Sequence, residues 1–521
     1  MFSKTAKAST QKSVFTLKAI AAAVTLCAGS TAFAAATGGF STTDGGSVSG
    51  SQAFTAATLD QLNTIVANAK AGNYPVVITY TGNEDSLINQ MIANHTVDAS
   101  GNCPNPRWND AYRKVEIKEM TKGVTIIGAN GSSANFGIVV NKSSNVIIRN
   151  MKIGALAGAN NDADMIRIDS GTNVWVDHNE LFAVNNECKG SPDGDLTFES
   201  AIDIKKDSHN ITVSYNVIRD SKKVGLDGSS SSDIAGGREI TFHHNIYRNV
   251  NARLPLQRGG WTHMYNNLYD GITDSGINVR QAGYSLIESN WFQNAKNPIT
   301  CRYDSSNCGF WDLRNNNVKT PGDFATYNIT WSSGGTIDAT NWTTTAPFPI
   351  SIPYSYSPVT PQCVKDKLDQ YAGVGKNGAQ LTASACGGTT SSVASSVAVS
   401  SSSKSSSSVA VVSSSSAVSS SKASSSAVAV SSSKASSSSA AASSASGAPV
   451  LSGTGDYPSG FSKCADLGGT CSVTSGDGWV AFGRKGSWVV KKVSVPGSIA
   501  CTVAAFGSDP QGNPNKCSYK K

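Results

Sequence analysis

The sequence lacks several features, and each absence removes a class of protein. After the first 34 residues no apolar run is long enough to span a bilayer, so we expect no membrane protein. No C-x-x-C motif occurs, which argues against a zinc site. The net charge of +7 comes from the two ends and a linker, and residues 35–386 carry about −4. Without a basic surface we expect no nucleic-acid partner.

The N-terminus has the features of an export signal. Lys4, Lys7, Lys12 and Lys18 precede an apolar run at 19–29 and a small-x-small site at 32–34. This pattern predicts a signal peptide over residues 1–34 and a secreted, extracellular protein. Of eleven cysteines, Cys27 lies in that signal, and the ten that remain suggest five disulfides in an oxidising compartment.

Composition divides the rest of the chain into three parts. Residues 387–446 are almost wholly Ser, Ala, Val and Lys, which cannot bury a core and predict a disordered linker. The linker separates a large domain at 35–386 from a small module at 447–521.

The large domain carries the signature of a solenoid. After a predicted helix at 58–70, short Val- and Ile-rich runs each end in asparagine, at Asn150, Asn179, Asn216, Asn245, Asn267 and Asn290. The spacings of 29, 37, 29, 22 and 23 residues indicate a coil of about 22 residues a turn, lengthened by loops. We expect an all-β solenoid in which stacked asparagines form a ladder and the helix caps one end. Hairpins of a β-sandwich are the alternative.

Two acidic clusters are candidate metal ligands. Asp162 and Asp164 are two residues apart, and Glu199 and Asp203 are four apart, so each pair would share one face of a strand. Four converging carboxylates would repel one another unless a cation lay among them, and hard oxygen donors favour Ca²⁺. Solvated surface acids are the alternative.

Basic residues follow in the next predicted turns. Lys222 and Lys223 lie in one, and Arg253 and Arg258 in another. Such cations can bind a polymer that bears carboxylates, and arginine can grip two oxygens at once. Ion pairs within the protein are the alternative.

The runs DMIRIDSGTNVWVDHNELF, FESAIDIKK, KKVGLDGSSSSD and NVNARLPLQRGG make the sequence resemble the calcium-dependent pectate lyases of polysaccharide lyase family 1, over about residues 37–386. The resemblance implies a right-handed parallel β-helix, Ca²⁺ as cofactor, polygalacturonate of the plant cell wall as substrate, and a monomer.

The resemblance also implies roles for particular residues. It makes Asp162, Asp164, Glu199 and Asp203 the calcium ligands, Arg253 the catalytic base, and Lys223 and Arg258 the groups that hold substrate carboxylates. It places Lys205, Arg280, Asp193 and Asp195 along the cleft. It pairs Cys103 with Cys188 and Cys363 with Cys386, and proximity suggests Cys301 with Cys308.

The implied reaction is β-elimination. Neutralising a galacturonate carboxylate acidifies the proton on the adjacent C5, and stabilising such developing charge is often the largest catalytic effect. The base removes that proton and the C4–O bond breaks, leaving a 4,5-unsaturated end. Arginine normally keeps its proton, so we expect nearby cations to disfavour the charged form of Arg253.

The tail module, residues 447–521, has four cysteines, Cys464, Cys471, Cys501 and Cys517, and its alternating runs indicate a small β-fold stapled by two disulfides. Two interpretations stay open. Its tryptophans form its core, or it binds pectin through aromatic faces with Lys485, Lys491 and Lys492.

Three rival functions remain for the large domain. A polygalacturonase-type hydrolase needs paired carboxylic acids, but no adjacent Asp-Asp pair occurs. A lyase of methylated pectin would not need four calcium carboxylates. A non-catalytic pectin-binding protein would not need the complete set of Arg253, Lys223 and carboxylates.

Overall fold

The computed structural model describes residues 37–106, 111–158, 162–188, 197–235, 237–302, 308–332, 337–387, 451, 455–485, 487–506 and 515–520. The predicted signal peptide, all but the first residue of the predicted linker, and the predicted cleft residues Asp193 and Asp195 lie outside this part of the chain. None of the described helices is both long and apolar enough to cross a membrane.

Three sheets make up the large domain. The ten-stranded sheet contains β1 (Gln52–Ala56), β2 (Val76–Tyr80), β4 (Val124–Gly128), β6 (Ser144–Arg149), β9 (Thr172–Asp177), β12 (His209–Ser214), β15 (Glu239–His243), β18 (Trp261–Tyr265), β21 (Tyr284–Glu288) and β24 (Phe310–Arg314). The seven-stranded sheet contains β7 (Lys152–Gly154), β10 (Glu180–Phe182), β13 (Val217–Lys223), β16 (Ile246–Ala252), β19 (Leu268–Ile272), β22 (Trp291–Lys296) and β25 (Ile329–Thr330). The nine-stranded sheet contains β3 (Lys114–Lys118), β5 (Gly137–Asn141), β8 (Ile166–Asp169), β11 (Ile202–Lys205), β14 (Gly225–Asp227), β17 (Leu256–Arg258), β20 (Ile277–Arg280), β23 (Ile299–Cys301) and β26 (Ile337–Asp338).

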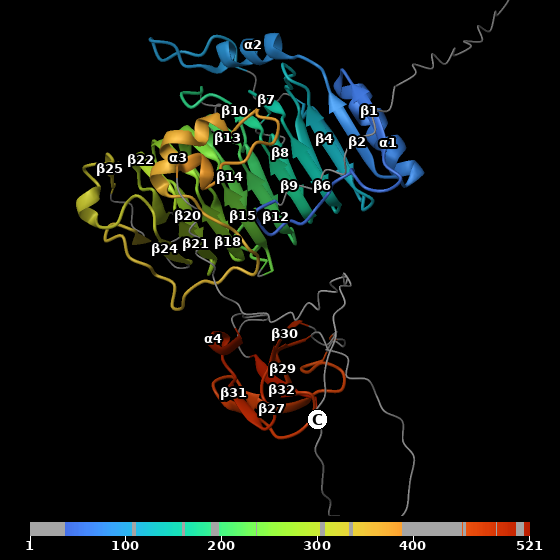
Figure 1. The fold of residues 1–521 in the computed structure, drawn as a ribbon, viewed down its shortest axis with the longest axis vertical. Coiled ribbons are helices and arrows are strands. Elements are labelled where there is room, and N and C mark those ends of the chain that lie inside the picture. The colour runs from blue at the N-terminus through green and yellow to red at the C-terminus, as the bar shows by residue number, and fades with distance from the viewer. Residues whose placement is uncertain are drawn as a thin grey trace, which may run out of the picture.

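The chain visits the three sheets in rotation. β11, β12 and β13 belong to three different sheets, and β14 returns to lie beside β11, which completes one turn of a coil. Within the three sheets every strand pair is parallel except β23 with β26. The predicted right-handed parallel β-helix is therefore confirmed, and Figure 1 shows its strands stacked turn upon turn.

Repeated β-branched residues fill the inside of the coil. Val174 of β9 pairs with Val146 of β6 on one side and with Ile211 of β12 on the other, and all three are fully buried. Because each turn repeats this inward pattern, the stacked side chains form one continuous core. Each such side chain contributes about 1.5–3 kcal/mol of burial free energy.

An asparagine ladder runs along one corner of the coil. Each side-chain nitrogen donates to the side-chain oxygen of the next asparagine at 2.9–3.1 Å, in the order Asn179, Asn216, Asn245, Asn267, Asn290 and Asn316. Buried polar groups need hydrogen-bond partners, and the ladder supplies them to the asparagine side chains at this buried bend.

The prediction that Asn150 begins this ladder is wrong. Strand register pairs Arg149 with Asp177, which brings Met151 rather than Asn150 to the level of Asn179. The Met151 backbone N–H donates to Asn179 Oδ1 at 2.9 Å. Asn150 instead occupies the preceding position, with a left-handed φ of 55° that asparagine tolerates well.

A helix caps the N-terminal end of the coil, as predicted. α1 (Leu59–Gly72) packs on β1, β2 and β3, and it buries Leu62 and Val66. The Thr58 hydroxyl accepts from the Gln61 backbone N–H at 3.2 Å, which satisfies one free donor of the first turn. Among its described residues this domain also contains the α-helices α2 (Asp85–His95) and α3 (Pro361–Lys367) and the short 3-10 helices η2 (Pro321–Asp323), η3 (Leu368–Gln370) and η4 (Ser384–Cys386).

The tail module has a fold of its own. β27, β32, β29 and β30 form an antiparallel sheet in that order, and β28 pairs with β31. A separate core contains Val473, Val480 and Phe482, and Phe482 stacks on Phe506 at 4.9 Å. Its elements are β27 (Ser462–Asp466), β28 (Thr470–Val473), β29 (Trp479–Arg484), β30 (Ser487–Lys492), β31 (Gly497–Ala500), α4 (Val503–Phe506) and β32 (Lys516–Tyr519).

All ten cysteines after residue 34 form disulfides. The pairs are Cys103–Cys188, Cys301–Cys308, Cys363–Cys386, Cys464–Cys471 and Cys501–Cys517. Two of the five bonds fall in the tail, whose core is too small to be expected to hold a fold unaided.

Candidate active site

The outer face of the nine-stranded sheet carries four of the predicted site residues, which are Asp203, Lys205, Arg258 and Arg280. In register, Asp203 of β11 lies opposite Arg167 of β8, and Arg258 of β17 lies opposite Arg280 of β20. Neighbouring strands are about 4.8 Å apart. Outward side chains of successive turns therefore form one continuous strip, which we call the charged strip.

Three of the four predicted metal ligands come from turns that precede the strands. β8 begins at Ile166, after Asp162 and Asp164, and β11 begins at Ile202, after Glu199. The expectation that the two carboxylates of each pair share one face of a single strand is therefore wrong. Asp162 has a φ of 52° and its side chain is 72% exposed, whereas that of Asp164 is 1% exposed. A tight turn, not a strand, gives the two carboxylates these different surroundings.

A buried lysine lies between the two innermost carboxylates. Lys205 Nζ is 2.7 Å from Asp203 Oδ2 and 3.2 Å from Asp164 Oδ2. Backbone groups complete the arrangement, since the Leu226 N–H donates to Asp203 at 3.0 Å and the Ser200 N–H to Asp164 at 3.3 Å. Charge-assisted bonds of this kind fix both carboxylates in place.

The cluster is nevertheless short of positive charge. Burial raises the pKa of Asp164 well above its ordinary value, and the negative charges of Asp203 and Glu199 raise it further. Burial alone would lower the pKa of Lys205, but the negative charges of Asp203 and Asp164 have the larger effect and raise that pKa. Further positive charge would therefore stabilise the ionised carboxylates.

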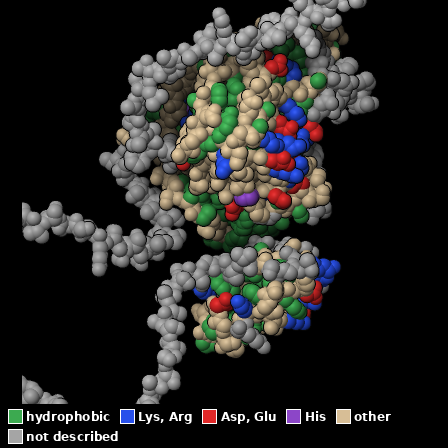
Figure 2. Space-filling model, turned by 90° about the vertical axis from the view of Figure 1, so that its right-hand side faces the viewer, with side chains coloured by type: hydrophobic (Ala, Val, Ile, Leu, Met, Phe, Trp, Pro, Cys, Tyr) green, Lys and Arg blue, Asp and Glu red, His purple; other side chains and the backbone are tan. Residues whose placement is uncertain are grey.

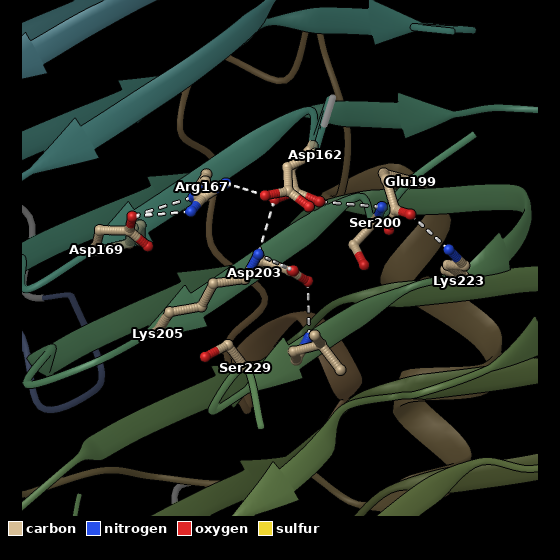
Figure 3. Close-up of polar contacts among 12 residues, drawn as sticks. Asp162, Arg167, Asp169, Glu199, Ser200, Asp203, Lys205, Lys223 and Ser229 are labelled. Carbon is tan, nitrogen blue, oxygen red and sulfur yellow. Dashed lines mark hydrogen bonds and ion pairs between the residues drawn. The ribbon is translucent and has the colours of Figure 1, made fainter. Parts of the chain in front are cut away.

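Each of the two outer carboxylates pairs with a different basic side chain. Glu199 Oε1 accepts from Lys223 Nζ at 2.6 Å, and Asp162 Oδ2 lies 3.3 Å from Arg167. Figure 3 shows Asp162, Glu199 and Asp203 on neighbouring turns, with the Glu199 carboxylate directed toward Lys223.

The residues present fit a hard cation such as Ca²⁺. All four predicted ligands offer carboxylate oxygens, and the Ser200 hydroxyl beside Asp164 is buried without a hydrogen-bond partner. As arranged, no three His, Cys, Asp or Glu side chains within the described ranges are gathered tightly enough to hold an ion. Glu199 and Asp162 pair with Lys223 and Arg167, so all four carboxylates could bind one ion only if Glu199 and Asp162 left these basic partners.

The predicted arginines follow on later turns. Arg253 comes directly after β16, with a left-handed φ of 69°, and Ala252 before it pairs with Lys223 of β13. Across the part of the chain that the structure describes, the Arg253 guanidinium makes no ion pair and no hydrogen bond. Arg258 donates to the Gly228 carbonyl at 2.6 Å, and Arg280 donates to Asn278 at 3.2 Å.

Sequence reasoning missed two residues of the acidic cluster. Arg167 alternates with Asp169 in β8 and is 3.1 Å from its carboxylate, a period-two signal that was present in the sequence. Tyr112 donates its hydroxyl to the Asp164 carbonyl at 2.6 Å. Nothing local marks Tyr112, because the contact spans 52 residues.

Comparison with known proteins agrees with this picture. A family model described as pectate lyase matches residues 13–377. Pectate lyase 3 of Pectobacterium atrosepticum is 57% identical over 383 residues, which are 71% of this chain and 99% of that protein. Pectate lyase B of Dickeya chrysanthemi is 57% identical over 378 residues, 70% of this chain and 98% of that protein.

Solved structures show the same fold. Pectate lyase C from Erwinia chrysanthemi with Ca²⁺ matches with a TM-score of 0.63 and 57% identity, over 67% of this chain and 99% of that one. Pectate lyase II from Xanthomonas campestris matches with a TM-score of 0.57 and 39% identity, over 66% and 99%.

The fold and its charged strip thus define a polysaccharide lyase built on a parallel β-helix. More narrowly, the chain belongs to the pectate lyase family, polysaccharide lyase family 1. The family match ends at residue 377 and does not extend to the tail module.

Proposed function

We propose that this chain cleaves polygalacturonate by calcium-dependent β-elimination and releases 4,5-unsaturated oligogalacturonides. A relative of 57% identity, an arginine-to-lysine variant of pectate lyase C, has been solved in complex with pentagalacturonic acid. The charged strip suits such a polymer, because its cations on successive turns match carboxylates on successive sugars.

Lys223 and Arg258 are proposed to hold the carboxylate of the reacting sugar. Lys223 is released for this role when Glu199, its partner at 2.6 Å, turns to a metal ion. Arg258 is oriented by its bond to the Gly228 carbonyl. Lys205, Arg280, Asp193 and Asp195 are proposed to line the rest of the cleft. Ca²⁺ bound by Asp162, Asp164, Glu199 and Asp203 would supply the positive charge that neutralises a substrate carboxylate.

The observation that carries the proposal is the position of Arg253. It follows the strand that pairs with Lys223, and it has no acidic partner among the described residues. With no carboxylate to stabilise its charge, and with Lys223 and Arg258 nearby, Arg253 is proposed to lose its proton in the complex. It then takes the proton from C5, the C4–O bond breaks, and the leaving oxygen is protonated from solvent.

The test is product analysis on polygalacturonate. We expect ultraviolet-absorbing unsaturated product from the wild type, none after chelation of calcium, and a loss of kcat of at least about 10³-fold in Arg253→Ala. Arg248→Ala is the matched control, since Arg248 lies on the preceding strand and pairs with Asp369 at 3.2 Å on the exposed surface. Full activity of Arg253→Ala, or of metal-free enzyme, would overturn the mechanism.

The same assay separates the rival functions. A polygalacturonase-type hydrolase would release reducing ends without unsaturated product, a lyase of methylated pectin would prefer the ester, and a pectin-binding protein would release nothing. A base that starts as a guanidinium also predicts a rate that rises between about pH 6 and pH 10.

We further propose that the protein is exported and acts as a monomer on plant cell walls. The lysine-rich leader and the five disulfides support an extracellular location. The processed N-terminus of protein recovered from culture medium would test export, and its mass in solution would test the monomer.

A further inference from the structure

The tail module keeps its two tryptophans out of its core. That core is made of Val473, Val480, Phe482 and Tyr519 together with cysteines, and it contains neither Trp479 nor Trp488. Both indoles are instead half-buried. A half-buried aromatic side chain outside the core leaves part of its ring open to a ligand.

Strand alternation places both indoles on one face of the sheet. In β29 the core residues Val480 and Phe482 alternate with Trp479, so Trp479 points the other way. Register sets Trp488 of β30 opposite Gly483 and sets Val489, which packs on the core, opposite Phe482. Trp488 therefore shares the face of Trp479, which we call the tryptophan face.

The two indoles lie at opposite ends of this face. Trp479 and Gly483 are four residues apart in β29, a distance of roughly 13 Å along the strand. Between them, Ala481 is fully buried, so this part of the face is covered and the exposed contact surface lies at the Trp479 end. The Trp488 ring is fixed by its Nε1–H, which donates to the Asp456 carbonyl at 3.3 Å.

Lysines flank the aromatic rings. Lys492 lies opposite Trp479 in register, and its ammonium is 5.5 Å from the centre of the indole. Lys516 lies 5.9 Å from the ring centre of Tyr457. A cation beside an aromatic ring offers both groups that recognise an acidic sugar, namely a surface for its C–H face and a charge for its carboxylate.

The charge of the module points the same way. Residues 447–521 contain eight Lys or Arg and four Asp or Glu, whereas residues 35–386 carry about −4. Figure 2 shows Lys and Arg side chains on both sides of the visible surface of the tail. A positive module attached to an enzyme for an acidic polymer is complementary to that polymer.

We infer that the tryptophan face binds an acidic polysaccharide, with Trp479 and Lys492 as its main contacts. The choice of polygalacturonate as the ligand rests on the proposed function. Of the lysines predicted from the sequence, Lys492 is included in this inference and Lys491 is left out. Lys491 lies on the opposite, core-side face, where its ammonium donates to the Ala505 carbonyl at 2.8 Å.

This adjacent pair of lysines provides a matched test. Full-length protein is applied to immobilised polygalacturonate in the presence of a calcium chelator and eluted with salt. We expect Lys492→Ala to bind about threefold more weakly and Trp479→Ala about tenfold more weakly, and Lys491→Ala to elute with the wild type. Because Trp479→Ala can also unfold the module, the comparison of the two lysines decides the question.

Each result has one meaning. Elution of all variants together with the wild type would overturn the inference, and so would equal retention on a neutral galactan. Neither result would touch lyase activity, which unsaturated product reports with calcium present. Absence of that product from the wild type would overturn the proposed function and leave a difference between the lysine variants standing.

Discussion

Replacing the buried lysine of the acidic cluster tests the electrostatics of the site directly. Lys205→Met keeps the length of the side chain but removes the charge between Asp203 and Asp164, whose side chains are each 1% exposed. Breaking a buried ion pair costs about 3–5 kcal/mol, because the remaining charge is left without compensation. Since the pKa of Asp164 is already raised, this carboxyl can take up a proton, and we expect a loss near 3 kcal/mol at neutral pH.

A neighbouring lysine serves as the control. Lys206 is 3.0 Å from Asp169, but its side chain is 56% exposed. Asp169 is only 6% exposed, but Arg167 also pairs with it at 3.1 Å, so loss of the exposed Lys206 partner should cost about 1 kcal/mol or less. Lys206→Met therefore removes the same charge one position along the chain with little expected effect on the free energy of unfolding.

Calcium adds a second, independent readout. If the four carboxylates bind Ca²⁺, an excess of one hundred times Kd stabilises the folded protein by about 2.7 kcal/mol. The gain should be larger in Lys205→Met, where the ion replaces a missing charge. Urea denaturation with chelator and with calcium measures both effects. A loss below 1 kcal/mol would show that the lysine does not balance the cluster. A wild type that calcium does not stabilise would refute cation binding there, and an identical loss with and without calcium would show that the ion does not replace the charge of Lys205.

Two further predictions concern stability. Asn245→Ala removes four side-chain hydrogen bonds, two donated and two accepted, and should lower the free energy of unfolding by about 4 kcal/mol. The control Asn251→Ala loses one exposed bond to Thr273 and should cost about 1 kcal/mol. Equal denaturation midpoints of the two variants would contradict a stabilising role of the ladder. Burial raises the pKa of Glu187 to about 7, so its folded state binds more protons than the unfolded state and its contribution is lost as the pH rises from about 4.5 through 7. Glu187→Gln should therefore gain on the order of 3 kcal/mol over the wild type across that window, and a constant difference would contradict the assignment.

The fold was largely predictable because its signals are periodic. Several turns repeat inward apolar residues such as Val174 and Ile211, the turns from Asn179 onward repeat a corner asparagine, and these features occur in sequence order. The failure at Asn150 has a physical cause. Asparagine serves both as a ladder residue and as a residue that tolerates a left-handed backbone, and only strand register tells the two apart.

The site was predictable in its residue types but not in their pairing. Four acids and four bases stand out from the sequence, yet Lys205 reaches Asp164 across 41 residues and Lys223 reaches Glu199 across 24. Loop lengths between turns decide such contacts, and these lengths vary from turn to turn. In the tail, alternation fixes that Trp479 and Val480 face opposite ways, but only packing decides which face becomes the core.

The order of charges along the coil carries the functional argument one step further. Carboxylates gather on β8 and β11, whereas Arg258 and Arg280 lie directly opposite one another on β17 and β20. Two guanidinium groups in register repel each other, as two carboxylates do. Under the proposed function, a bound cation would lower the repulsion among the carboxylates, and sugar carboxylates would lower the repulsion between the two guanidinium groups. The order of like charges along the charged strip therefore agrees with the polyanionic substrate that we propose, and it assigns the acidic turns to the cation and the basic turns to the sugar carboxylates.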